Sequence, residues 1–314
     1  MRPGSAQAPA DAVDPAALDT AALQELHDAV TATLASRNAT LAYAEQVFQN
    51  IAGWFENAAG GYGGKRILEL GPGDSLVVGA LLLANGAEQY TAVDRFPLAS
   101  RDPNMYRSLR EHLARDPLVR MAGQFAAKAT ALARYDDAVR LVGDTVTFDE
   151  SFLSWICPAD AAALPLADGS FDICFSNATF EHVREVERAV QESVRVLRPG
   201  GYGIHQIDLR DHRDFDKPLA FLCEDKAAWE RIFRESKEAE YTNRWRVHEF
   251  VEAFRRTGAE IVTATSTWFA DDLEDLRPRL ATEFKDLRDE DLLALDAFLV
   301  VRKSEESSVA PGHR

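Results

Sequence analysis

RILELGPGDS, residues 66–75, is the stretch that decides the fold of this chain. Its apolar run, Ile67 to Leu70, predicts a buried strand. The strand ends in Gly71-Pro72-Gly73, a turn tight enough to expose backbone N–H groups, and an apolar helical pattern follows from Leu76 to Leu83. A ligand can therefore lie against bare backbone at the carboxyl end of a strand, beside a helix N-terminus.

Two acidic residues indicate what kind of ligand this turn holds. Glu69 lies near the end of the first strand, and Asp94 closes the next apolar run, Tyr90 to Val93. An acid at that distance is where a nucleotide-binding sheet holds a ribose diol. Taken alone, the pattern fits both a nicotinamide dinucleotide and S-adenosylmethionine. Leu76 stands where the dinucleotide fingerprint has its third glycine, and Pro72 removes an amide donor, so the second ligand is favoured.

Two further motifs lie downstream, ADAAALPLADGSFDICFSN at residues 159–177 and LRPGG at residues 197–201. Together with the glycine turn and Asp94, in this order, they resemble the class I S-adenosylmethionine-dependent methyltransferases. The resemblance runs from about Arg66 to Asp208 and resumes weakly to Lys303. It implies a Rossmann-like, doubly wound α/β fold with a seven-stranded sheet, an antiparallel last strand and S-adenosyl-L-methionine as the cofactor.

The pattern of apolar runs predicts how the sheet is built. Helical patterns separate most of these runs, and this alternation indicates a parallel sheet covered on both faces. A further short strand near residues 146–148 pairs with the main sheet or lies apart from it. The predicted strands are Arg66–Leu70, Gln89–Val93, Phe171–Ser176, Gly203–Asp208, Glu260–Ser266 and Asp296–Lys303.

The chain is longer than a minimal methyltransferase domain, which residues 65–303 are predicted to form. Insertions at 95–158 and 209–259 follow strand carboxyl ends, where an open α/β sheet has its ligand crevice, so we expect them to form a helical cap that walls the acceptor pocket. The alternative is that they only thicken the fold. The remaining predicted segments are a disordered N-terminus (1–15), N-terminal helices (16–64), a long acidic helical segment (271–295) and a flexible tail (304–314).

The N-terminal helices have two possible places. They cover the ligand as part of the cap, or they pack on the outside of the sheet, and the sequence leaves both open.

The resemblance assigns cofactor-binding roles to individual residues. It places Gly71 and Gly73 beside the methionine part of the cofactor and Glu69 near its amino group, although Glu69 could instead pair with Arg66. The sulfonium and the amine are cationic, so acids are expected around them. The other implied residues are Asp94 at the ribose, Arg95, Asp160 and Ala161 at the adenine, and Asn177 and Ala178 at the methionine part and the methyl group.

Catalytic candidates follow the strand ends nearest the methyl group. An oxygen acceptor needs a base for its proton, commonly His or a carboxylate. His182 follows Asn177 by about one helical turn, while Asp208 ends a strand and His212 follows it. His205 is expected to pair within the sheet. Asp208, Asp211, His212 and Asp214 could also hold a divalent cation, but their spacing matches no known site, and no metal is predicted.

Basic and aromatic residues further along are candidates for binding a small polar acceptor. Arg210, Tyr241 and Arg244 lie in a basic island of an acidic chain and could bind a carboxylate or phosphate. Ion pairing with Asp211, Asp214 or Glu240 is the alternative. O-methylation is the expected reaction, with N- or C-methylation left open. The other functions weighed are a nicotinamide-dependent oxidoreductase, for which no Tyr-x-x-x-Lys pair exists, and a non-catalytic module that binds the cofactor.

The bulk composition narrows the partners. The net charge of −16 argues against a nucleic-acid groove, because phosphate binding needs a basic face. The three cysteines form no C-x-x-C pair, so neither a zinc cluster nor a disulfide framework is indicated. No apolar run approaches the roughly 20 residues that span a bilayer. A cytoplasmic location and a small-molecule substrate are expected, and the oligomeric state stays open.

Overall fold

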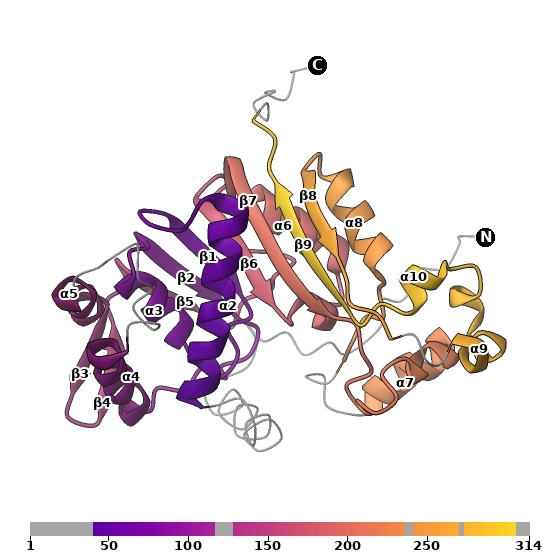
Figure 1. Cartoon of the computed structure of the whole chain (residues 1–314), viewed down its shortest axis with the longest axis horizontal. Coiled ribbons are helices and arrows are strands. Elements are labelled where there is room, and N and C mark those ends of the chain that lie inside the picture. The colour runs from indigo at the N-terminus through magenta and orange to yellow at the C-terminus, as the bar shows by residue number, and fades with distance from the viewer. Residues whose placement is uncertain (1–39, 117–127, 236–240, 270–272, 306–314) are drawn as a thin grey trace, which may run out of the picture.

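The computed structural model describes residues 40–116, 128–235, 241–269 and 273–305. Its main sheet has seven strands in the order β5-β2-β1-β6-β7-β9-β8 (Figure 1). Six strands run in one direction, and β9 is antiparallel to both of its neighbours. This order confirms the predicted fold class. The bounds are β1 Arg66–Leu70, β2 Gln89–Val93, β5 Leu153–Ile156, β6 Phe171–Asn177, β7 Leu197–Asp208, β8 Glu260–Thr265 and β9 Asp296–Arg302.

Helices cover both faces of the sheet, as its apolar strands require. One face packs against α2 (Leu41–Ala59) and α3 (Val77–Ala84), and the other against α6 (Val186–Arg195) and α8 (Val247–Arg256). Figure 1 shows α2 in front of the sheet and α6 behind it. The cofactor candidates lie at strand ends within this double layer.

Helix α2 shows where the described part of the N-terminal helical segment lies. Thr40 caps its first turn by accepting a hydrogen bond from Tyr43 N, and buried side chains recur at helical spacing along it. Phe55 meets Phe175 of β6 edge to face, with ring centroids 5.2 Å apart. Residues 40–59 therefore pack on the outside of the sheet, which was the second of the two predicted places. The rest of the predicted helical segment before Thr40, and the N-terminus, lie outside the described residues.

The predicted insertion at 95–158 contains one strand of the main sheet. Strand β5 pairs with β2 in parallel, from Leu153 opposite Tyr90 to Ile156 opposite Val93. The expected insertion boundary is therefore too late, and the added segment ends before β5. The short strand carries Ser154 and Trp155 within it, so it lacks the continuous apolar run that marks β1 and β2.

The elements added between β2 and β5 extend the α3 face of the sheet. They are α4 (Pro103–Arg115), α5 (Lys128–Ala138) and a separate antiparallel hairpin of β3 (Val139–Val142) and β4 (Thr145–Phe148). The Tyr135 hydroxyl donates to the Tyr106 carbonyl at 2.7 Å, which joins α5 to α4. The Tyr106 hydroxyl in turn accepts from Leu76 N at 3.2 Å, beside the glycine turn. The described part of this segment therefore thickens one face. It contacts the glycine turn through Tyr106 and through the Ser100 N–H, which donates to the Asp74 carbonyl at 2.7 Å.

The second predicted insertion, 209–259, also includes a helix of the main α/β fold, α8. Helix α8 packs on the sheet as the crossover to β8, so the addition ends near Arg246. It consists of η3 (Ala220–Cys223), α7 (Lys226–Glu235) and the segment from Tyr241 to Arg246.

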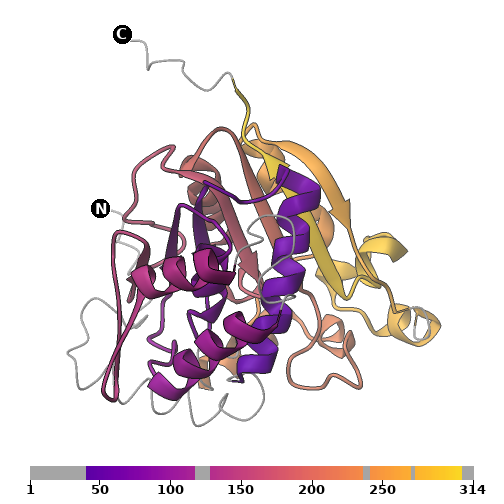
Figure 2. The ribbon, with the colours of Figure 1, turned by 60° about the vertical axis from the view of Figure 1, so that its left-hand side comes forward.

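A third apolar cluster joins this addition to the β8–β9 connection. The long helix predicted over 271–295 is wrong for the described residues from Leu273 onward, because Pro278 and irregular apolar spacing divide the segment. Figure 1 shows α7, α9 and α10 together at one end of the molecule, and Figure 2 shows the magenta helices at the other. The elements of the connection are α9 (Leu273–Leu276), η5 (Arg277–Arg279), η6 (Thr282–Phe284) and α10 (Asp289–Leu292). We call 209–246 and 266–295 together the cap.

Candidate cofactor and acceptor sites

The glycine turn after β1 has the backbone that its sequence predicts. Gly71 and Gly73 have φ values of 70° and 66°, which side chains disfavour. The Gly71 N–H donates to the Val93 carbonyl at 2.9 Å, fixing the turn to the end of β2. A Cβ atom at Gly71 would lie 2.5 Å from Thr179 Oγ1, whereas one at Gly73 would meet nothing within 4 Å. Gly71 is needed for close packing, and Gly73 leaves its side of the turn open.

Asp94 lies just beyond β2 and faces this turn. Its carboxylate accepts a hydrogen bond from Phe96 N at 3.0 Å. Burial raises the pKa of Asp94 to about 6, and backbone N–H groups of Phe96, Gly73 and Arg95 lower it only in part. The Arg95 guanidinium lies 5.7 Å from the Phe96 ring centroid. Burial deprives this carboxylate of some of its water. A ligand that brings hydrogen-bond donors can replace that water, so the position suits such a ligand.

Glu69 is buried in β1, and it does not pair with Arg66. The Arg66 backbone N–H donates to Asp172 Oδ2 at 2.8 Å, and the Arg66 guanidinium faces the same carboxylate. Glu69 instead accepts a hydrogen bond from the Tyr90 hydroxyl. Burial raises the pKa of Glu69 to about 8 despite this bond. Tyr90 was missed from sequence, although it stands two residues before Ala92, the register partner of Glu69, and so shares its face.

The remaining predicted cofactor residues meet at the same edge of the sheet. Asp160 is exposed and accepts from Ala162 N at 2.8 Å, with Ala161 beside it. The neighbouring Ala159 N–H donates to the Asp94 carbonyl at 2.8 Å, which joins this loop to β2. Asn177 ends β6, and Ala178 follows with φ 50°.

His182 lies in η2 (Phe180–His182), the turn that follows β6. Its Nδ1 is 2.7 Å from the Tyr241 carbonyl, so Nδ1 carries the proton and Nε2 keeps its lone pair. Burial, followed by the nearby His212, lowers the pKa of His182 to about 4. A third of the side chain is exposed. The ring is thus neutral near pH 7 and presents one free acceptor nitrogen.

Asp208 and His212 are brought beside His182, as their positions predict. The His182 and His212 ring centroids are 5.1 Å apart, and His212 Nε2 is 3.5 Å from Asp208 Oδ2. The Arg210 guanidinium donates two hydrogen bonds to Asp208, from Nε to Oδ1 at 2.9 Å and from Nη2 to Oδ2 at 2.6 Å. Burial would raise the pKa of Asp208, but hydrogen bonds from Arg210 and the proximity of His212 hold that pKa well below its usual range. Asp208 is therefore a fixed anion that orients its neighbours.

Glu181 is a member of this cluster that sequence reasoning missed. Its side chain is 3% exposed, and neither carboxyl oxygen has a hydrogen-bond partner among the described residues. Burial raises its pKa well above the usual range, and the charge of Asp208 adds to that shift. Glu181 Oε1 lies 4.0 Å from His182 Nε2. The Glu181-His182 pair in the sequence was the only signal, and it does not reveal which way the acid points.

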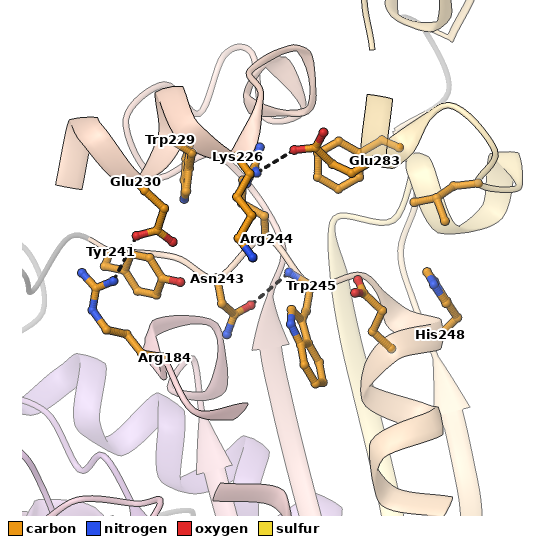
Figure 3. A pocket seen from close by; sticks show the side chains of 13 residues that line it. Arg184, Lys226, Trp229, Glu230, Tyr241, Asn243, Arg244, Trp245, His248 and Glu283 are labelled. Atoms are coloured by element: carbon orange, nitrogen blue, oxygen red, sulfur yellow. Dashed lines mark hydrogen bonds and ion pairs between the residues drawn. The ribbon is translucent and has the colours of Figure 1, made fainter. Parts of the chain in front are cut away.

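The three predicted substrate-binding residues do not share one pocket. Tyr241 and Arg244 line a cavity of about 440 Å³ between α7, η6 and the start of α8 (Figure 3), whereas Arg210 is paired with Asp208. Figure 3 shows Tyr241 beside Arg184, whose guanidinium is 4.0 Å from the Tyr241 ring centroid. The backbone from Tyr241 to Asn243 bonds to η2 through the Tyr241 carbonyl and the Asn243 N–H, so it separates this cavity from His182.

Arg244 is held in place on every side. It has a left-handed φ of 63°, and its guanidinium donates to the Glu224 carbonyl at 2.6 Å and Glu283 Oε1 at 3.0 Å. The rings of Trp229 and Phe284 lie 5.3 and 5.1 Å from it. Ion pairing therefore occurs for Arg244, but with Glu283 rather than with the predicted acids.

Another residue weighed from the sequence, His205, lies in β7. His205 pairs within the sheet, because its Nδ1 lies 2.9 Å from Ser176 Oγ. In the described ranges, no three His, Cys, Asp or Glu side chains are arranged to hold a metal ion. Within those same ranges, no helix has the length and apolar character needed to cross a membrane.

Comparison with known proteins identifies the central segment. A family model described as a methyltransferase domain matches residues 119–205. Malonyl-[acyl-carrier protein] O-methyltransferase of Methylococcus capsulatus is 57% identical over 42 residues, which are 13% of this chain and 15% of that protein. An uncharacterized methyltransferase of Mycolicibacterium gilvum is 50% identical over 46 residues, 15% of this chain and 18% of that protein. The chain thus spans less than a fifth of the length of these curated relatives.

A solved structure with the same overall extent is a putative sarcosine dimethylglycine methyltransferase from Galdieria sulphuraria. It aligns with a TM-score of 0.47 at 11% identity and covers 90% of this chain and 99% of its own. A methyltransferase from Mesorhizobium loti aligns with a TM-score of 0.42 at 17% identity and covers 77% and 92%.

Proposed function

We propose that this chain, a class I S-adenosylmethionine-dependent methyltransferase by its strand order and its matched domain segment, transfers the methyl group of S-adenosylmethionine to an oxygen of a small polar acceptor. The observation that carries the proposal is the juxtaposition at one sheet edge. The open turn of Gly71 and Gly73 faces Asp94, and the free Nε2 of His182 follows the next strand end.

Each part of the cofactor has a matching group at this edge. Gly71 and Gly73 would pass the methionine part, with Glu69 near its amino group. The buried acids favour this assignment because the sulfonium and the amine are cationic. Asp94 would accept from the ribose hydroxyls. Arg95, Asp160 and Ala161 would border the adenine, and Asn177 and Ala178 the methionine part and the methyl group.

The chemical step depends more on aligning the acceptor oxygen with the methyl group than on reactive side chains of the protein. Methyl transfer is an in-line displacement at the sulfonium, so holding the acceptor oxygen near the methyl supplies much of the rate. His182 Nε2 would take the hydroxyl proton as the methyl is transferred. Asp208, fixed by Arg210, would hold His212 beside that base. Because the pKa of His182 is about 4, this weak base favours an acceptor with a readily ionised hydroxyl.

Calorimetric titration of the protein with S-adenosylmethionine, its demethylated product and NADH tests the cofactor assignment. We expect binding of the first two and none of NADH. Asp94→Ala should weaken cofactor binding by about 1–3 kcal/mol through lost charged hydrogen bonds. The exposed Asp144→Ala variant, on the β3–β4 turn, is the control and should bind normally. Heat with NADH and none with S-adenosylmethionine would refute the proposal.

Binding without turnover would instead indicate a cofactor-binding module. Transfer of a tritiated methyl group from S-adenosylmethionine to hydroxylated acceptors separates the two functions. Label recovered on an ether or ester oxygen supports O-methylation, and label on nitrogen or carbon contradicts it.

A further inference from the structure

We propose that the acceptor is a hydroxylated aromatic carboxylate whose ring stacks on Phe215 and His212 while its hydroxyl meets His182. This inference rests on the proposed methyl transfer and names its substrate class. It is carried by the loop from Asp208 to Asp216, which follows β7 at the acceptor side of the cluster.

Two Asp–Arg pairs, Asp208 with Arg210 and Asp211 with Arg213, fix the shape of this loop, and we call each pair a clasp. Asp208 accepts from the backbone N–H of Arg210 at 3.1 Å and from its guanidinium. Asp211, which is 2% exposed, does the same with Arg213, at 3.0 Å from the N–H and 2.9 and 2.7 Å from the guanidinium. Two-point contacts of this kind are strong and directional. The loop is therefore preformed rather than dependent on a ligand for its shape.

Two aromatic rings of this loop lead outward from His182. His212 lies between Asp211 and Arg213, the residues of the second clasp, and its ring centroid is 5.1 Å from that of His182. Phe215 follows and stacks on His212, with centroids 5.8 Å apart and planes 30° apart. Phe215 is 54% exposed. A partly exposed aromatic surface thus begins beside the His182 ring.

A lone exposed Phe is common on protein surfaces and needs no explanation. This one differs because its loop is clasped at two points and because its ring borders the catalytic candidates. Aromatic pairs in offset or tilted geometry gain attraction beyond the burial of their area, so a ring is the ligand group that such a surface favours. A short aliphatic acceptor would leave most of Phe215 uncovered.

Arg210 supplies the site for the carboxylate. Its guanidinium lies 4.7 Å from the Phe215 ring centroid, and its side chain is 41% exposed. Asp208 occupies Nε and Nη2, while Nη1 has no hydrogen-bond partner among the described residues. A carboxylate on the acceptor ring can therefore bind Nη1 without displacing Asp208. Burial and the adjacent His212 also keep His182 a weak base, which suits a phenol better than an aliphatic alcohol, because a phenol ionises more readily.

The test compares two pairs of probes with tritiated S-adenosylmethionine. Caffeate and protocatechuate carry a phenol and a carboxylate on one ring, whereas lactate and glycerate carry aliphatic hydroxyls. We expect methylation of the aromatic pair. Phe215→Ala should raise KM for the aromatic probes about three- to tenfold with little change in kcat. Phe215→Leu should reverse less than half of that increase in KM, because it restores apolar area without a ring.

Phe152→Ala is the matched control, since this Phe is 36% exposed but lies just before β5. It should leave KM unchanged. Methylation of lactate or glycerate but not of the aromatic probes would overturn the proposal, as would a KM that does not respond to Phe215→Ala. Normal cofactor binding with no aromatic probe methylated would also overturn it. Failure of the proposed function is distinguishable, because the protein would then not bind S-adenosylmethionine in the titration.

Discussion

The cofactor edge and the cap beside it are built by different means. At the predicted cofactor edge, the backbone determines the geometry: the glycine φ values, the Gly71–Val93 hydrogen bond and the ends of β1 and β2 position the glycine turn and Asp94. In the cap, side chains make it. The Asp–Arg clasps, the His182–Tyr241 contact and the stacked rings hold a segment whose described residues form helices and loops.

This difference has a consequence for function. A site formed by backbone tolerates little change in chain geometry but holds one cofactor in many proteins of the fold. A site formed by side chains can be altered residue by residue, so it is the natural place for acceptor specificity. The four predictions below test this contrast.

The largest expected effect is on turnover in the acceptor half. His182→Ala should lower kcat by roughly 10²–10⁴-fold, because it removes the base while leaving the cofactor contacts in place. Single-turnover assays with an acceptor that the parent protein methylates, combined with calorimetry of cofactor binding, measure the two properties separately. His112→Ala, which removes a partly exposed His that pairs with Glu45, is the control. Full turnover in the His182 variant would mean that transfer proceeds by alignment alone.

The second prediction tests whether side chains hold the cap. Arg246 is fully buried, and its guanidinium donates to the carbonyls of Leu209, Asp291, Leu292 and Ala294. Arg246→Met keeps the volume but leaves these acceptors unpaired, so we expect a loss of about 3–4 kcal/mol in the free energy of unfolding.

Denaturant titration measures that loss, and Arg255→Met, an exposed change on α8, the helix that follows Arg246, serves as its control. A loss below about 1 kcal/mol in the Arg246 variant would show that apolar packing, and not this arginine, fastens the cap.

The cofactor edge and the cap also differ in how much of each the sequence predicts. The bounds of β1 and β2 agree with the sequence to the residue, because both are apolar runs with clear ends. Strand β5 was assigned to an insertion because polar Ser154 and bulky Trp155 hide its burial pattern. The LRPGG turn belongs to the start of β7 in the structure, where the register with β6 shifts.

In the cap, the sequence indicates the chemistry but not the contacts. The sequence predicts one basic island for Arg210 and Arg244 because both belong to the predicted insertion 209–259, yet the fold gives them different partners, Asp208 and Glu283. Glu181 and Phe215 drew no functional prediction, since burial without a partner and stacking on His212 arise only from tertiary packing. His182 and Asp208 could be named because they follow strand ends, where position alone is informative.

The third prediction compares two glycines of one turn. Gly71→Ala and Gly73→Ala impose a similar left-handed strain, about 1–2 kcal/mol each. Only Gly71→Ala also drives a Cβ into Thr179 at the start of the η2 segment. We expect it to cost at least about 1 kcal/mol more in the free energy of unfolding. Parallel thermal unfolding of both variants checks this, and equal losses would indicate that Thr179 moves aside freely.

The smallest expected effect is the pH dependence of cofactor affinity, which acts through the buried acids of the backbone-built half. The pKa of Asp94 is about 6 and that of Glu69 about 8, both raised by burial. Ionised acids favour the cationic cofactor, so affinity should increase as the pH rises from 6 to 8.5, by up to about tenfold per ionisation.

The stability of the free protein should change with pH in the opposite direction. Since both values lie above those of the unfolded chain, the protonated folded state is favoured, and these acids should lower the free energy of unfolding as the pH rises from about 4 to about 8. Glu69→Gln should flatten the upper part of both curves, which calorimetry and thermal unfolding measure at each pH. A variant whose affinity still rises between pH 7 and 8.5 as steeply as the parent's would assign that titration to a group outside β1, and the acids of the glycine turn would then not be what the cofactor senses.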